Sequence, residues 1–247
     1  MENAQLITLS RQGALRNQLN VVANNMANLN TSGFKAQQLL FEEYLMPVAE
    51  ATEFQTPDED LSYVNDYGTA FDFSEGGIRT TGNPFDLAVE GDGFFVVQME
   101  DGSEAYTRSG AFQLDQNGTL VTADGRPVMT EGGPITFGTA DGQVEIARDG
   151  TISTEQGARG RIRLVDFENP QDLRVLGDNL FVGEEPLPLI PVRNVVQGAL
   201  ENSNVEGVVE MTRLIELTRA YESATKMQQD LDELRKTAIQ TLGTVEA

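Results

Sequence analysis

The strongest constraint on this sequence is that its two ends follow one hydrophobic period and its middle follows another. Residues 3–29 carry apolar side chains at every third or fourth position, which is the period of a helix with one apolar face. Residues 204–242 repeat this period, interrupted by Gln228. Turn dipeptides and short apolar runs fill the middle, which is typical of antiparallel β structure. The sequence therefore predicts an α+β fold, with N- and C-terminal α-helices that form a coiled-coil element and a central antiparallel β-rich domain.

The two predicted helices, at 3–30 and 203–242, are about 40 Å and about 60 Å long at a rise of 1.5 Å per residue. Gly33 provides a stop after the first helix, Asn204 is expected to cap the second, and Gly243 ends it. An apolar stripe left in water costs about 25 cal/mol per Å². Because two paired helices hold too small a core for stability, we expect them to become ordered when neighbouring subunits surround them.

The stripes and the asparagines near the first helix end form a predicted assembly interface. Asparagine is unusual inside a helix, so we expect these amides to hydrogen-bond between packed helices. The predicted interface residues are Leu6, Leu9, Leu15, Leu19, Val22, Asn24, Asn25, Met26, Asn28, Leu29, Val208, Met211, Leu214, Ile215, Leu217, Tyr221, Leu231, Leu234 and Leu242.

Five Asp-Gly or Asn-Gly dipeptides predict tight two-residue turns in the middle of the chain. They lie at 101–102, 117–118, 124–125, 141–142 and 149–150. The strands predicted between and beside them cover 93–99, 104–115, 119–122, 143–147 and 160–167. The run Phe94-Phe95-Val96-Val97 is apolar throughout, so its strand is expected to be buried on both faces.

Residues 42–75 fit neither pattern, because they hold ten acidic residues, no Lys or Arg, and six aromatic residues. We expect an extended acidic connector that becomes ordered against a neighbour. The predicted organisation is an N-terminal helix (1–32), the connector (33–76), a central β-rich domain (77–200) and a C-terminal helix (201–247).

The composition argues against several functions. The chain has no Cys and no His, so disulfides, the usual zinc ligand sets and a histidine general base are excluded. Its net charge is -22, which is unfavourable for binding nucleic acid or an anionic membrane surface. It contains no apolar run long enough for a transmembrane helix and no signal-peptide pattern at Met1–Ser10. We expect no cofactor, metal or small-molecule substrate.

A few short patterns call for separate interpretation. Gly91-Asp92-Gly93 lacks the rest of a nucleotide-binding fingerprint and is interpreted as a turn before a buried strand. Asp115-Gln116-Asn117-Gly118 fails the spacing of a calcium loop and is interpreted as a hairpin. Asp58-Glu59-Asp60 lies in a polar stretch, so solvated carboxylates are expected rather than a catalytic pair. Arg108 is predicted to pair with a carboxylate, inside the β domain by default or else across subunits.

Three groups of residues resemble the motifs of the flagellar basal-body rod protein family. The motif residues are Val22–Asn28, Thr31 and Gly33–Lys35 in the first group, Thr81–Val89, Gly91–Phe95, Tyr106–Arg108, Gly110, Phe112 and Leu120–Thr122 in the second, and Leu200–Val205 and Arg219–Glu222 in the third. The groups occur in the family's order and span nearly the whole chain. Within the family, the length and Met1–Ala4 are most similar to the proximal-rod members.

The resemblance implies a structural protein rather than an enzyme. Such a subunit would leave the cell unfolded through the flagellar type III export apparatus, without a cleavable signal peptide, and join itself and other rod subunits in the periplasm-spanning rod. The alternative within the family is a distal-rod or hook subunit. The alternative from another class is a carboxylate-dependent hydrolase acting on cell-wall polymer.

Overall fold

The computed structural model describes residues 2–46, 61–184, 186–188 and 195–243 of the 247-residue chain. The chain divides into two compact units. The helical unit comprises Met1–Met26, Gln37–Ala70 and Glu206–Ala247, and the β unit comprises Ala27–Ala36 and Phe71–Val205. The predicted terminal helices and antiparallel β-rich middle are both confirmed. Neither described helix combines the length and the apolar character that crossing a membrane requires.

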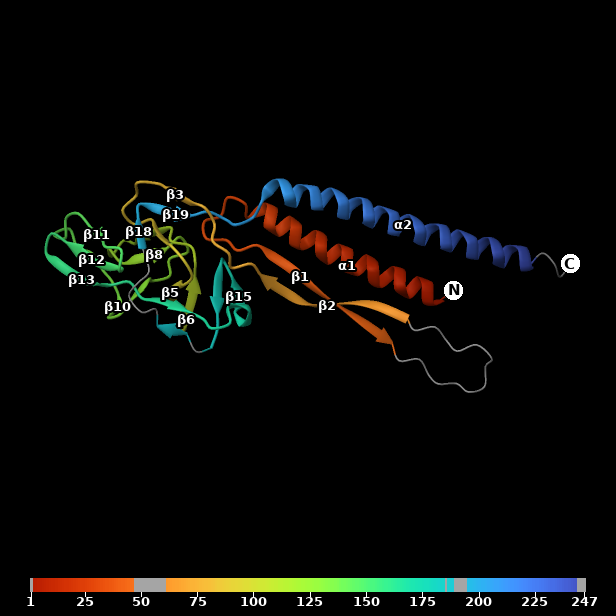
Figure 1. The fold of residues 1–247 in the computed structure, drawn as a ribbon, viewed down its shortest axis with the longest axis horizontal. Coiled ribbons are helices and arrows are strands. Elements are labelled where there is room, and N and C mark those ends of the chain that lie inside the picture. The colour runs from red at the N-terminus through yellow and green to blue at the C-terminus, as the bar shows by residue number, and fades with distance from the viewer. Residues whose placement is uncertain (1, 47–60, 185, 189–194, 244–247) are drawn as a thin grey trace. The chain divides into compact units, whose positions relative to one another are not determined.

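The helical unit contains α1 (Glu2–Ala27), β1 (Gln37–Met46), β2 (Leu61–Phe71) and α2 (Gly207–Gly243). The two helices lie side by side and run in opposite directions (Figure 1). The Gln12 amide donates a hydrogen bond to Thr225 Oγ1 at 3.5 Å, which joins the middles of the helices. Strands β1 and β2 pair as a two-stranded sheet, so part of the expected extended connector is regular β structure.

The predicted stripe of α2 separates into two groups of residues. Half-buried or buried side chains occur at alternating spacings of four and three residues, namely at Glu210, Leu214, Leu217, Tyr221, Ala224, Gln228, Leu231 and Arg235. Gln228 therefore belongs to this row and does not interrupt it. Val208, Met211, Ile215 and Leu234 were assigned to the same stripe but are exposed, because their positions fall outside this spacing. The side chains of Leu6 and Leu242 lie outside the description.

Asn204 does not cap α2, contrary to the prediction. The helix begins at Gly207, and the Glu210 amide donates to the Glu206 carbonyl at 3.0 Å. The Asn204 amide instead bonds to main-chain groups of two other segments. Its hydrogen-bonding capacity is therefore used away from the helix end.

The β unit is built from short antiparallel strands. These elements are β3 (Ile78–Thr80), β4 (Leu87–Val89), β5 (Phe94–Gln98), β6 (Glu104–Thr107), β7 (Phe112–Leu114), β8 (Leu120–Thr122), β9 (Met129–Thr130), β10 (Gly133–Pro134), β11 (Glu145–Ile146), β12 (Thr151–Thr154), β13 (Gly157–Arg161), β14 (Leu164–Asp166), the 3-10 helix η1 (Pro170–Asp172), β15 (Arg174–Gly177), β16 (Leu180–Val182), β17 (Leu187–Pro188), β18 (Val195–Gln197) and β19 (Ala199–Glu201).

The largest sheet has the strand order β15-β16-β6-β5-β14-β17, with β5 at its interior. As predicted, β5 is buried on both faces. Phe95 and Val97 belong to one hydrophobic cluster, whereas Phe94 and Val96 belong to a second. Phe73, from the expected connector, packs on the second cluster with its ring 5.6 Å from that of Phe94. The aromatic end of that segment is thus ordered inside its own chain.

The five Gly-containing dipeptides do form turns, but not the predicted two-residue type. The glycine of each pair has positive φ, while the preceding Asp or Asn does not. At Gly102, Gly118, Gly125 and Gly150, the glycine N–H bonds to the carbonyl three residues earlier. This is a turn followed by one left-handed residue, which only glycine adopts at little cost. A turn with positive φ at two successive residues occurs at Asp178-Asn179, between β15 and β16.

Asp141 organises one of these turns through several hydrogen bonds. Its Oδ2 accepts from the Gly138 N–H at 2.6 Å and from Arg159 Nη2 at 2.7 Å. The Arg159 guanidinium, followed by the Gly138 N–H, lowers the pKa of this carboxyl from its ordinary value. Such a carboxylate stabilises the folded state above its unfolded pKa, and the stabilisation is lost as the pH falls through the lower, folded pKa.

We therefore expect Asp141→Asn to weaken the β unit near neutral pH, with a difference from the native chain that shrinks in acid. The check is a series of urea denaturation midpoints between about pH 7 and about pH 2, which extends below the ordinary Asp pKa of about 3.9 into the range of the lowered folded pKa. A difference between the two proteins that stays constant over this series would contradict the role assigned to Asp141.

Candidate functional site: a buried ionic junction in the β unit

A buried carboxylate with two cationic partners lies at the end of β19. Glu201 Oε1 accepts from Lys35 Nζ at 2.7 Å, and Glu201 Oε2 accepts from Arg108 Nε at 2.9 Å. The three side chains are only 1% to 3% exposed. We call Lys35, Arg108 and Glu201 the ionic junction. The predicted pairing of Arg108 with a carboxylate inside the β unit is confirmed.

Main-chain groups satisfy the remaining hydrogen bonds of the junction. Lys35 Nζ donates to the Ser74 carbonyl at 2.6 Å, and the Gly76 N–H donates to Glu201 Oε1 at 3.0 Å. The Arg108 guanidinium donates to the carbonyls of Gly91 and Gly93. The Gly91-Asp92-Gly93 turn before β5 therefore serves as an acceptor for an arginine.

The electrostatic balance of the junction is unequal, because one carboxylate faces two cations. Burial lowers the pKa of Lys35 from its ordinary value, the charge and hydrogen bond of Glu201 oppose this fall, and Arg108 adds to it. Buried ion pairs gain less than their Coulomb energy suggests, since desolvation offsets it. Removing one member, however, leaves an uncompensated charge in a low-dielectric environment. The junction therefore fixes geometry more than it adds net stability.

Next to the junction, the Asn204 amide joins three segments of chain. Its Oδ1 accepts from the Ala36 N–H at 2.7 Å, and its Nδ2 donates to the Asp72 carbonyl at 2.7 Å. The Asp72 N–H in turn donates to the Ala36 carbonyl at 2.9 Å. Ala36, Phe71 and Val205 are residues at which the chain passes between the two units. The Asn204 side chain thus links the ends of three β-unit segments, at Ala36, Asp72 and Asn204 itself, through hydrogen bonds within that unit.

Two glycines allow these segments to approach closely. Gly33 has φ +68, and a Cβ atom there would lie 2.4 Å from the Ser109 nitrogen. A Cβ atom at Gly76 would lie 2.0 Å from the Asn202 carbonyl oxygen. Both contacts are with main chain, which cannot rotate away as a side chain can. The segments around Gly33 and Gly76 therefore depend on glycine.

The junction is suited to a mechanical role. The Glu201 carboxylate is inaccessible to solvent, and both of its oxygens already accept hydrogen bonds. A general acid or base must reach a substrate proton, which this carboxylate does not. What the arrangement does is hold distant chain segments in one fixed geometry.

The predicted interface residues of the N-terminal segment differ from one another in burial. Val22 is buried and Leu15, Leu19, Met26 and Leu29 are half-buried, whereas Leu9 is exposed.

Asn25 is buried and its amide is used inside the chain, since Oδ1 accepts from the Gln37 N–H at 2.9 Å and Nδ2 donates to the Gln37 carbonyl at 3.0 Å. Asn28 Oδ1 accepts from Thr31 Oγ1 at 3.0 Å. Asn25 thus fixes the start of β1, a role that its helical context did not predict.

Sequence reasoning did not predict that Lys35 and Glu201 pair. Each residue stands in a different motif, and the two are 166 positions apart. The available signal was a charged residue beside apolar neighbours in each motif, Phe34 before Lys35 and Leu200 before Glu201. That signal predicts burial but does not identify the partner.

Three family models match the chain, and each covers one member of the ionic junction. A flagella basal body rod protein model matches residues 6–35, which include Lys35. The flagellar hook protein FlgE/F/G D1 domain matches residues 88–154, which include Arg108. The flagellar basal body rod FlgEFG protein C-terminal model matches residues 196–241, which include Glu201. The junction therefore joins the three matched regions.

Similar proteins match over most of the chain. The flagellar basal-body rod protein FlgF of Caulobacter vibrioides is 41% identical, covering 99% of this chain and 100% of its own length. FlgF of Mesorhizobium japonicum is 32% identical over 99% of both chains. A flagellar basal-body rod protein FlgG of Buchnera aphidicola is 34% identical over 87% of this chain and 90% of its own length.

Proposed function

Because the chain belongs to the family of flagellar basal-body rod proteins, we propose that it is a structural subunit of the proximal rod in the bacterial flagellar basal body. The FlgF relatives that match nearly end to end support this assignment. We further propose that the rod crosses the periplasm, that the subunit contacts itself and other rod subunits, and that the flagellar export apparatus delivers it without a cleavable signal peptide.

The helical unit supports a mechanism of assembly through the terminal helices. The half-buried row of α2 suits pairing with α1 as a coiled coil, since its spacing alternates between four and three residues. Other apolar side chains of α2 are uncovered, with Val208 81%, Leu234 66% and Ile239 71% exposed. Water contact with these side chains is unfavourable. Neighbouring subunits that covered them would gain this free energy on assembly.

The ionic junction supports a role in bearing load. A rotating rod must pass force from subunit to subunit without local yielding. Lys35 lies in the segment after α1, Arg108 directly follows β6, and Glu201 ends β19. The two ion pairs of Glu201 therefore join these three segments. Interactions buried in a closely packed interior transmit strain rather than absorb it. We propose that the ionic junction keeps these three segments rigid under torque.

A substitution at the exposed residues of α2 tests the proposed function. We expect the triple variant Val208→Lys, Leu234→Lys, Ile239→Lys to fold with unchanged circular dichroism, because these side chains are exposed. It should fail to restore swimming in a strain lacking the subunit, and its recovery in purified basal bodies should fall at least about tenfold. Burying three charges without partners is prohibitive.

The matched control is Ser223→Lys, Gln229→Lys, Gln240→Lys, which adds the same charge at exposed polar positions of α2. This control should restore swimming to the strain lacking the subunit and be recovered in basal bodies like the native chain. Normal assembly of the first variant would rule out the exposed apolar residues as the assembly surface.

A distal-rod or hook subunit of the same axial family is the second candidate, favoured by the FlgG match over 87% of the chain. Gold labelling of the subunit in isolated basal bodies distinguishes these two candidates. Label at the motor-proximal end of the rod supports a proximal-rod subunit, and label at the hook-proximal end supports a distal-rod or hook subunit.

A further inference from the structure

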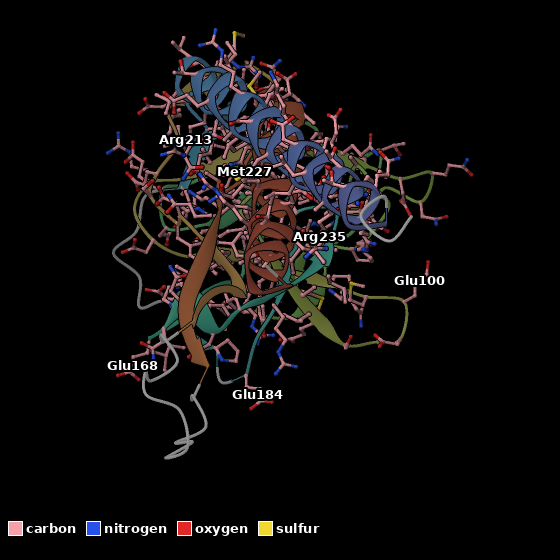
Figure 2. All side chains as sticks on the ribbon, turned by 90° about the vertical axis from the view of Figure 1, so that its right-hand side faces the viewer. Glu100, Glu168, Glu184, Arg213, Met227 and Arg235 are labelled. Atoms are coloured by element: carbon pink, nitrogen blue, oxygen red, sulfur yellow. The ribbon has the colours of Figure 1, made fainter. Side chains whose placement is uncertain are left out.

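The helical unit contains a pocket of about 450 Å³ between α1, β1 and α2. Val21, Val22 and Leu217 form apolar parts of its wall. Glu210, Arg213 and Glu216 place charges at the same pocket. Arg213 lies toward the start of α2, with Met227 and Arg235 following along the helix (Figure 2). The walls thus combine apolar surface with an excess of negative charge.

Glu210 has one carboxylate oxygen without a hydrogen bond. The residue is 5% exposed, and its Oε1 accepts from Arg213 Nη1 at 2.8 Å. Among the described residues, no donor reaches the buried Glu210 Oε2. A buried charged oxygen without a donor is unfavourable. A donor that entered the pocket would satisfy this oxygen.

The chemistry of the pocket matches an arginine side chain. Its methylene stem can lie along the apolar wall while the guanidinium donates to carboxylates. In the segment 2–27, Arg11 and Arg16 are the basic residues. Both are exposed, and only Arg16 lies on the side of α1 opposite the pocket-lining Asn25, by the helical period of 3.6 residues.

The surroundings of Arg16 allow another chain to approach. Gly13 lies one turn away on the same side of α1, and a Cβ atom added there would meet no atom within 4 Å among the described residues. Arg16 makes no ion pair with the part of the chain that the structure describes. A second copy of α1 could therefore bring Arg16 close to an acidic surface.

We propose that Arg16 of a second copy enters the pocket and donates a hydrogen bond to Glu210 Oε2. This inference deepens the proposed function and rests on it, since it requires copies that pack through their helices. Each copy carries both the pocket and the arginine, on opposite sides of α1. The contact is therefore heterologous and can repeat from subunit to subunit, as an open helical assembly requires.

A double-mutant cycle tests the contact in basal bodies assembled by the full chain. We expect Arg16→Gln to lower recovery of the subunit at least about tenfold, because truncating one member of a buried charge pair leaves the other unpaired. Glu210→Gln should cause a similar loss. The double variant should lose little more than either single variant, since both changes remove the same interaction.

Arg11→Gln is the matched control, because it removes an exposed arginine from the other side of the same helix. It should assemble like the native chain. Equal losses from Arg11→Gln and Arg16→Gln, or additive losses from Arg16→Gln and Glu210→Gln, would overturn the assignment.

Cross-linking gives a readout that does not depend on the charge pair. Because the chain has no Cys, one copy with Gly13→Cys, which keeps Arg16, and another with Glu216→Cys can be joined only through the introduced thiols. A short bis-maleimide should give a dimer that the pair Arg11→Cys and Glu216→Cys does not. If the α2 lysine variant fails to assemble while Arg16→Gln assembles normally and no dimer forms, the proposed function stands and the pocket assignment is wrong.

Discussion

Replacing Glu201 with glutamine is expected to lower the free energy of unfolding of the β unit by about 3 to 5 kcal/mol, which is the typical cost of breaking a buried ion pair. The substitution keeps the shape of the side chain but removes the negative charge that faces Lys35 and Arg108. Both cations would then be buried without compensation. An amide would also present an N–H group to one of these donors.

Urea denaturation followed by far-UV circular dichroism measures this loss. The control is Glu131→Gln, which removes an exposed carboxylate 3.8 Å from Arg161. We expect less than about 1 kcal/mol there, because exposed pairs contribute little. Similar losses for the two variants would show that the ionic junction is not a buried electrostatic unit.

Replacing Gly110 with alanine is expected to destabilise the β unit by about 3 kcal/mol or more, at the upper end of what inserted atoms cost in a packed interior. A Cβ atom at this position would lie 1.7 Å from the Leu87 carbonyl oxygen. The same two residues are hydrogen-bonded, since the Leu87 N–H donates to the Gly110 carbonyl at 3.0 Å. Relief of the collision would therefore pull β4 away from the segment before β7.

Gly77→Ala is the appropriate comparison, because a Cβ atom there meets nothing within 4 Å among the described residues. Its expected effect is within about 0.5 kcal/mol, as for most exposed substitutions. The measurement is the difference in melting temperature by circular dichroism. Unchanged melting of the Gly110 variant would mean that the close approach to Leu87 is not required for the fold.

The sequence predicted those parts of the fold that are encoded locally. The Phe94–Val97 run identified the buried strand because every residue in it is apolar. The glycine dipeptides identified turns because positive φ favours glycine, although the exact turn type depends on the residues before them. The helices were evident from their period. These features require only neighbours in sequence.

The features that escaped prediction depend on distant partners. Asn204 was expected to cap a helix, but its partners Ala36 and Asp72 are 168 and 132 positions away. Lys35 and Glu201 form one pair across 166 positions. On α2, apolar residues occur on more than one side, so the period alone could not separate Leu217, which faces α1 and β1 at the pocket, from the exposed Val208.

The ionic junction also determines when the β unit can be completed. The chain is made from its N-terminus, so Lys35 and Arg108 emerge long before Glu201 does. Until that residue arrives, two cations have no carboxylate to accompany them into the interior. Long-range closure of this kind slows folding. A partly synthesised subunit therefore cannot complete the β unit until most of its length exists, since Glu201 is the carboxylate that both cations require.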